Sequence, residues 1–179
     1  MELRAENGRP SQTEGRSPRE IRVYDHLDAI GIRYRRVDHP PVHTMEDCEA
    51  ADAVLGATLC KNLVLCNRQE TAFYLLLMPS DKPFKTKDLS AQIGSSRLSF
   101  ASAERMEELL GVTPGCATVM GLLQDVQGKV KLLIDRDLCN VAEFGCHPCV
   151  NTASIAFATA DLFETLLPSL HREPTFVTL

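Results

Sequence analysis

Two apolar segments separated by a polar turn constrain the fold of this chain most strongly. Residues 63–66 and 72–78 are almost wholly apolar, and the polar turn Asn67-Arg68-Gln69-Glu70 lies between them. Neither segment alternates between polar and apolar residues, as a strand with one solvated face would. The pair therefore predicts a β-hairpin that is buried on both faces, with other elements packed against each face.

The rest of the chain predicts short helices interleaved with short strands. It lacks the regular strand–helix alternation and GxGxxG turn of a dinucleotide fold, and also a P-loop and a GxSxG elbow. The predicted fold class is mixed α/β (α+β): a single domain with a central mixed, barrel-like β-sheet surrounded by short helices. Helices are expected over residues 18–30, 44–55, 86–93, 102–110 and 159–167, and further strands over residues 32–39, 97–100, 116–123, 130–134 and 155–158.

Residues 1–17 differ in composition from the rest. They are rich in Arg, Glu, Gly, Ser and Gln and hold few large apolar residues, so they predict a disordered leader before a domain at residues 18–179. The N-terminus has no hydrophobic stretch typical of a signal peptide, and no apolar run approaches the roughly 20 residues that span a bilayer. We therefore expect a cytoplasmic protein without a membrane partner.

The charge balance limits how the chain can meet nucleic acid. Its net charge is −5, from 24 acidic residues against 19 Lys and Arg. Proteins that bind duplexes nonspecifically are usually basic, and no helix-turn-helix pattern is present, so DNA binding is not expected. A local basic patch formed by Lys82, Lys85, Lys87 and Arg97 is a candidate tRNA contact, although a solvated surface would have the same composition.

The seven cysteines indicate neither a disulfide framework nor a metal centre. Their number is odd and their spacing is irregular. Cys146 and Cys149 form a CxxC, but zinc would need two more ligands and no second CxxC exists. We expect no metal and no cofactor, and we interpret these cysteines as small buried thiols.

Lys61 and Asn62 stand at the mouth of the first apolar segment. An ammonium and an amide at the start of a strand can both reach the rim of one cleft. Lys61 could then hold a carbonyl or phosphate oxygen, and Asn62 a water or hydroxyl. A surface lysine beside a strand-start asparagine is the plainer alternative.

Two further motifs offer groups for a pocket. Gly111-Val112-Thr113-Pro114-Gly115 predicts a tight turn whose backbone can approach a ligand closely, because glycine has no Cβ. His147-Pro148 places an imidazole beside a rigid neighbour. Taken alone, the first motif could be an ordinary helix-to-strand turn, and the second could be a surface histidine.

Considered together and in order, these motifs resemble the free-standing aminoacyl-tRNA editing domains related to the insertion domain of bacterial prolyl-tRNA synthetase. The similarity extends over about residues 20–168. It is carried by residues 61–65, 81–83, 87–89, 97–100, 110–115 and 147–152.

The resemblance implies an aminoacyl-tRNA deacylase, a carboxylic ester hydrolase that edits mischarged tRNA in trans. Alanyl-tRNA(Pro) is the favoured substrate, with tRNA(Pro) as partner and a transient association with prolyl-tRNA synthetase. Lys61 would be the key catalytic residue with Asn62 beside it. The substrate pocket would be completed by Gly111, Pro114, Gly115, His147 and Pro148.

The chemistry agrees with this implication. An aminoacyl ester is already activated, so its hydrolysis mainly requires a positioned water and stabilisation of the oxyanion. The sequence offers no Ser-His-Asp set, and such a reaction needs none. The main alternative is a noncatalytic regulator that binds an amino acid or a charged tRNA and uses Lys61 only as an anion anchor.

Overall fold

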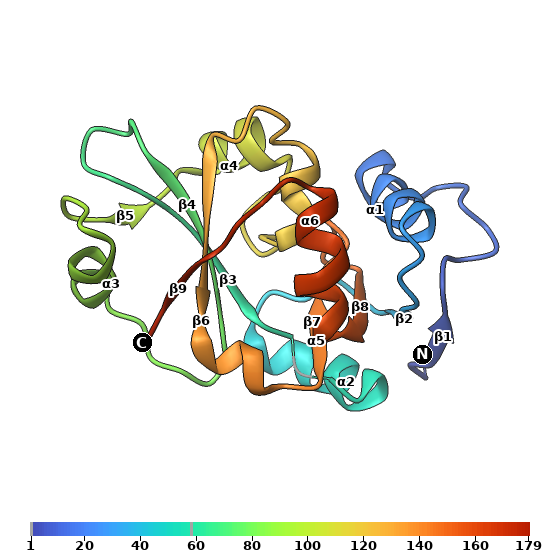
Figure 1. Ribbon diagram of the computed structural model, residues 1–179. Helices are drawn as coiled ribbons and strands as arrows, with labels where there is room; N and C mark the ends of the chain where they lie inside the picture. Colours follow the sequence, from blue (N-terminus) through green and yellow to red (C-terminus); the bar gives the residue numbers. More distant parts are fainter. Residues whose placement is uncertain (1, 58) are drawn as a thin grey trace.

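A five-stranded mixed sheet forms one half of the computed structural model, which describes residues 2–57 and 59–179 (Figure 1). Strands β3 (Lys61–Cys66) and β4 (Phe73–Met78) form the predicted hairpin, with Lys61 opposite Met78 and Cys66 opposite Phe73. Strand β6 (Val130–Asp135) pairs in parallel with β4, and β9 (Thr175–Val177) pairs in parallel with β6. In spatial order the sheet contains β5 (Ser99–Phe100), β3 (Lys61–Cys66), β4 (Phe73–Met78), β6 (Val130–Asp135) and β9 (Thr175–Val177).

The other half is a four-stranded antiparallel sheet. A parallel bridge between Leu59 and Gly145 joins it to the segment that enters β3, and the Cys60 amide donates to the Gly145 carbonyl at 3.1 Å. The start of β3 therefore lies where the two sheets meet. In spatial order the second sheet contains β1 (Ala5–Asn7), β2 (Arg35–Asp38), β8 (Ala153–Ala158) and β7 (Glu143–Cys146).

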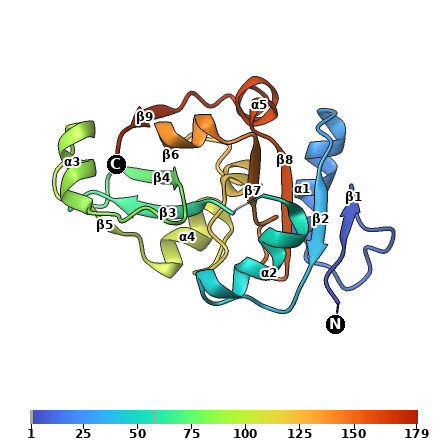
Figure 2. The same ribbon diagram turned by 90° about the horizontal axis from the view of Figure 1, so that it is seen from below.

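Short helices surround the two sheets, as Figure 2 shows from a second direction. Their ends follow local signals: Ser17 caps α1 ahead of Pro18, and Thr44 and Asp47 form a capping box at the start of α2. The helical elements are α1 (Pro18–Ala29), α2 (Met45–Leu55), α3 (Thr86–Ile93), α4 (Ala103–Leu110), the 3₁₀ turns η1 (Val119–Leu123) and η2 (Arg136–Asn140), and a C-terminal run of α5 (Thr159–Asp161), the π-helical η3 (Leu162–Leu166) and α6 (Leu167–Ser169).

The hairpin is buried on both faces, as its sequence predicts. Leu75 and Leu77 belong to the main hydrophobic cluster, whereas Leu76 and Met78 belong to a second cluster on the opposite face. All four side chains are fully buried. The mixed α/β class is confirmed, and the two sheets are joined at a bridge and do not form a closed barrel.

The strand predicted over residues 116–123 is wrong, because this segment forms η1 instead. Thr118 explains the difference: its hydroxyl donates to the His147 carbonyl at 2.7 Å and accepts from the Met120 amide at 3.3 Å, which starts a turn. Gly121 then packs tightly on α4, where a Cβ would lie 3.0 Å from Leu110. Strands β1, β7 and β9 also lie outside the predicted elements.

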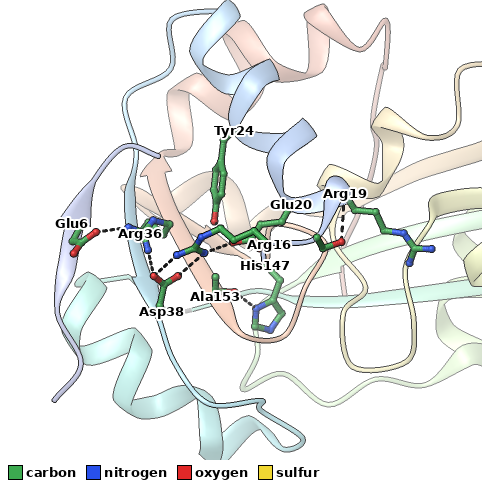
Figure 3. Close-up of polar contacts among 10 residues, drawn as sticks. Glu6, Arg16, Arg19, Glu20, Tyr24, Arg36, Asp38, His147 and Ala153 are labelled. Atoms are coloured by element: carbon green, nitrogen blue, oxygen red, sulfur yellow. Dashed lines mark hydrogen bonds and ion pairs between the residues drawn. The ribbon is translucent and has the colours of Figure 1, made fainter. Parts of the chain in front are cut away.

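The predicted disordered leader also differs from the structure. Residues 5–7 pair with β2 as strand β1, and Arg16 bonds both Glu20 and Asp38 (Figure 3). Backbone pairing and ion pairs hold this segment, with apolar burial limited to Pro10 and part of Leu3. A prediction based on apolar content does not detect that kind of stabilisation.

Across residues 2–57 and 59–179, every helix falls short of the length and apolar character that crossing a bilayer requires.

Candidate functional site

A cleft of about 330 Å³ opens at the junction of the two sheets. It brings together four of the predicted site residues, Lys61, Asn62, Gly115 and His147, from segments far apart in the sequence. A larger cavity of about 620 Å³ adjoins it and shares Cys60 in its wall. The cleft is lined by Val42, His43, Thr44, Cys48, Cys60, Lys61, Asn62, Leu63, Gly115, Ala117 and His147.

Lys61 is oriented by a neutral group. Its ammonium donates to the Lys82 carbonyl at 2.9 Å, and within the described residues no carboxylate forms an ion pair with it. The Lys82 ammonium itself is neutralised by the buried Asp135 at 2.7 Å and by Asp137 at 2.8 Å. Lys61 therefore keeps a cation available for a ligand in the cleft.

Asn62 is held against Cys60, two residues earlier in the chain. Its Nδ2 donates to the Cys60 carbonyl at 3.0 Å and lies 3.2 Å from the Cys60 Sγ. Its Oδ1 is buried, and no donor among the residues described here reaches it. Burial raises the pKa of the Cys60 thiol to about 12, so this thiol stays protonated and is a poor nucleophile.

His147 is buried and locked in orientation. Its Nδ1 lies 2.9 Å from the Ala153 carbonyl, so this nitrogen carries the proton (Figure 3). Burial lowers the pKa of His147, although the bond to Ala153 partly opposes that effect. The ring is therefore neutral near pH 7, and Nε2 remains as a hydrogen-bond acceptor.

The predicted glycine turn reaches the cleft through Gly115 alone. Gly115 has φ +87°, a conformation that favours glycine, and it forms part of the wall. Gly111 instead ends α4 with φ +61° and faces Gln124. Pro114 is exposed and Pro148 is buried, and neither lines the cleft.

The candidate tRNA contacts divide into two groups. Lys82 is occupied by its two aspartates, whereas Lys85, Lys87 and Arg97 are exposed. Arg97 lines an open groove of about 590 Å³ at β5, together with Arg68 and Phe100, and Phe100 is 61% exposed. Cations beside an exposed aromatic ring form a surface suited to single-stranded nucleic acid.

Sequence reasoning missed the loop between β2 and α2, where Val42, His43 and Thr44 form one wall. It also missed His39 and Ser154, which lie behind His147. The break in the strand pattern at His39-Pro40-Pro41 was the available signal for this loop.

The seven cysteines are free thiols, and Cys146 and Cys149 are buried as expected. Burial raises the pKa of both, that of Cys149 to about 12. In the described part of the chain, no group of three His, Cys, Asp or Glu side chains is placed to hold a metal ion.

Comparison with known proteins connects this geometry to one family. The sequence model of the aminoacyl-tRNA editing domain matches residues 39–165. The chain is 32% identical over 136 residues to the prolyl-tRNA editing protein ProX of Acetoanaerobium sticklandii, covering 76% of this chain and 83% of that protein. It is 29% identical over 147 residues to prolyl-tRNA synthetase associated domain-containing protein 1 of Danio rerio, covering 81% and 79%.

A larger protein also contains a similar region. A proline–tRNA ligase from Methylobacillus flagellatus is 30% identical over 142 residues, which are 74% of this chain but 23% of the ligase. Among solved structures, one described as a candidate trans-editing enzyme for prolyl-tRNA synthetase superposes with a TM-score of 0.67 at 19% identity, covering 91% of this chain and 98% of that one. The last likeness supports the fold.

Proposed function

The chain belongs to the aminoacyl-tRNA editing domain family, and on that premise we propose that it is a trans-acting aminoacyl-tRNA deacylase whose substrate is alanyl-tRNA(Pro). One observation carries the proposal: Lys61, Asn62, Gly115 and His147 meet in a single cleft. All four lie within the residues matched to the family.

In the proposed reaction, water attacks the ester carbonyl and the bond to the ribose oxygen breaks. The Lys61 ammonium stabilises the developing oxyanion or holds the terminal phosphate by a charge-assisted hydrogen bond. Asn62 and the backbone at Gly115 orient the water. The proton of the water passes to the leaving ribose oxygen through the neighbouring hydroxyl of the substrate, giving free amino acid and tRNA.

The size of the cleft supports a small aminoacyl group. Leu63 and His147 both line the cleft of about 330 Å³, and the adjoining cavity beside Cys60 offers room for the terminal adenosine. A synthetase site built for proline excludes a smaller amino acid weakly, because each missing methylene costs only about 1–3 kcal/mol. A second site that admits alanine and rejects proline would remove the error.

The β5 surface, which we define as Arg68, Lys85, Lys87, Arg97 and Phe100, is the proposed contact for the tRNA. Phe100 pairs with Leu65, four residues along β3 from Lys61, which corresponds to about 13 Å. The unpaired 3′ end of a tRNA could cross that distance to the cleft. We include tRNA(Pro) and a transient association with prolyl-tRNA synthetase in the proposal, since a related region occurs within a larger proline–tRNA ligase.

Replacement of the cleft lysine tests the proposal. Lys61→Ala should lower the deacylation rate of alanyl-tRNA(Pro) by about 10² to 10³, because one charge-assisted contact to an oxyanion is lost. The measurement follows loss of the aminoacyl label from a panel of mischarged tRNAs. Lys129→Ala, at an exposed position outside the cleft, is the matched control.

Near wild-type deacylation by folded Lys61→Ala would remove this residue from the site. Tight binding of a charged tRNA by the unmutated protein, without hydrolysis of any member of the panel, would instead indicate the noncatalytic regulator. Equal cleavage of prolyl- and alanyl-tRNA(Pro) would exclude proofreading of this kind, since the correct product would be destroyed.

A further inference from the structure

The loop between β4 and α3, residues 79–85, supplies the group that orients Lys61. The Lys61 ammonium donates to the Lys82 carbonyl at 2.9 Å, and the part of the chain that the structure describes offers it no second acceptor. An ammonium has three N–H donors, so two stay available for a ligand in the cleft. A lysine side chain has much rotamer freedom to lose, so the direction of Lys61 depends on where this carbonyl lies.

By itself this loop is weakly held. Among the described residues, one backbone hydrogen bond forms within it, from the Lys82 amide to the Pro79 carbonyl at 3.3 Å. Pro83 follows directly and has no N–H to donate. Phe84 packs against the second hydrophobic cluster and anchors the end of the loop that leads into α3. The end at Lys82 therefore depends on another contact.

The Lys82 side chain supplies this contact. Its ammonium bonds Asp135 at 2.7 Å and Asp137 at 2.8 Å. Asp135 ends β6 and is fully buried, and its other carboxylate oxygen accepts the Asp137 amide at 3.0 Å. Strand β6 belongs to the same sheet as β3, so the pair ties the loop to the sheet that carries Lys61.

Positioning explains an ion pair at this place better than stability does. Burying two charges costs solvation, so a buried pair often contributes no more to stability than apolar side chains of similar volume. A charge-assisted hydrogen bond has a defined length and direction, which an apolar contact lacks. The pair therefore fixes the place of the Lys82 backbone more closely than packing alone would.

We propose that Lys82 is a positioning residue for deacylation. Its side chain, clamped by Asp135 and Asp137, fixes its own carbonyl, and this carbonyl directs the Lys61 ammonium into the cleft. The inference rests on the proposed function and deepens it, because Lys82 then serves catalysis and not the contact with tRNA that its charge suggests. We call Lys82, Asp135 and Asp137 the Lys82 clamp.

Neutral replacement of the clamp tests the inference. Lys82→Met with Asp135→Asn removes both buried charges together, and an asparagine can still accept the Asp137 amide. We expect kcat/KM for alanyl-tRNA(Pro) to fall by about 10- to 100-fold, since a displacement of about 1 Å at a reacting group can cost about 10²-fold. Lys82→Arg keeps the charge and should retain most of the activity.

The decisive comparison repeats the double replacement in Lys61→Ala. There it should change the single-turnover rate by less than about twofold, since the group that the clamp positions is absent. An equal loss in both backgrounds would show that the clamp supports only the fold and would overturn the inference. An unchanged rate in the otherwise unmutated protein would also overturn it and leave the deacylase function intact. Absence of hydrolysis by the unmutated protein would overturn both.

The Lys61 ammonium has a readout besides activity. In ¹⁵N NMR its hydrogens should exchange slowly with water in the wild type and faster in the double variant. Arg172→Met with Asp125→Asn is the matched control, since it removes another buried ion pair, at 3.0 Å, whose carboxylate also accepts the backbone amides of Lys129 and Val130, outside the cleft. The control should lose stability and leave both the exchange at Lys61 and the deacylation rate unchanged. Equal exchange at Lys61 in the wild type and the clamp variant would overturn the assignment.

Discussion

At the scale of single residues, the burial of His147 affects the pH dependence of stability as well as its hydrogen bonding. Burial lowers its pKa and also lowers that of His26. Unfolding returns each ring to a pKa of about 6.5, so the unfolded chain binds more protons just below that pH. The contribution of the two neutral rings to stability should therefore be complete above about pH 6.5. Below that pH the free energy of unfolding should fall, by at most about 1.4 kcal/mol per pH unit for each histidine.

The measurement is the urea midpoint between pH 5 and 7.5 for the wild type and for His147→Gln. The variant should lose less stability on acidification, because one of the two rings no longer has to gain a proton on unfolding. Parallel curves for the two proteins would show that His147 titrates alike in both states.

The sequence predicted several residues of the cleft from their type, but it could not show which of their neighbours in sequence also line it. Lys61, Asn62, Gly115 and His147 were predicted and do line the cleft, whereas the adjacent Gly111, Pro114 and Pro148 do not. Proximity in sequence does not say which way a side chain points after a turn. Ser154 was not predicted, because a serine within an apolar strand has no distinguishing local pattern. Its hydrogen bond with His39 becomes visible only in the structure.

At the scale of elements, predictions succeeded where the pattern was local. The helices that begin beside Ser17 and Thr44 and the apolar hairpin could be predicted, because neighbours in sequence supply their capping and pairing contacts. The strand prediction for residues 116–123 failed because apolar content indicates burial and does not indicate conformation. The hydrogen bond from Thr118 to the distant His147 carbonyl decides the conformation there. Strand β9 depends in the same way on pairing with β6 across the chain.

The β5 surface provides the prediction that belongs to this scale. Arg68→Ala with Arg97→Ala should weaken tRNA binding and reduce the slope of log affinity against log salt by about one to two, since two phosphate contacts are lost. Phe100→Ala should cost about 1–3 kcal/mol of binding with little change in slope, because stacking on a base carries no charge. Fluorescence binding titrations at several salt concentrations measure both quantities.

Arg33→Ala with Lys129→Ala is the control pair, since both cations are exposed and lie outside the β5 surface. Hydrolysis of a minimal aminoacyl-adenosine ester should be unchanged in every one of these variants. A slope that falls equally in the control pair would mean that the protein responds to total charge rather than to this surface.

At the scale of the whole molecule, an ion network ties the N-terminal segment to the second sheet (Figure 3). Arg36 is buried and bonds both Glu6 of β1 and Asp38 of β2. Burial alone would raise the pKa of Asp38, but hydrogen bonds from Arg16 and Arg36 outweigh that effect and hold it below its usual value. Asp38 precedes His39, so the network also supports the strand that leads into the cleft wall.

The network predicts an unequal response to changes at its centre and at its edge. The double variant Glu6→Gln with Asp38→Asn should lower the free energy of unfolding by about 3–5 kcal/mol, because Arg36 would remain buried without a counter-charge. Arg36→Met should cost far less, since the partly exposed carboxylates of Glu6 and Asp38 can be solvated while an apolar side chain of similar volume fills the buried position. Adding Arg36→Met to the double variant should therefore restore stability, although each change by itself removes part of the same network.

Glu2→Gln, in an exposed pair with Arg4, is the control, and we expect a change of about 1 kcal/mol or less. Denaturant unfolding of the wild type and the four variants measures these differences. If the triple variant is no more stable than the double variant, the loss comes from the pairing of β1 with β2 and not from the uncompensated charge of Arg36.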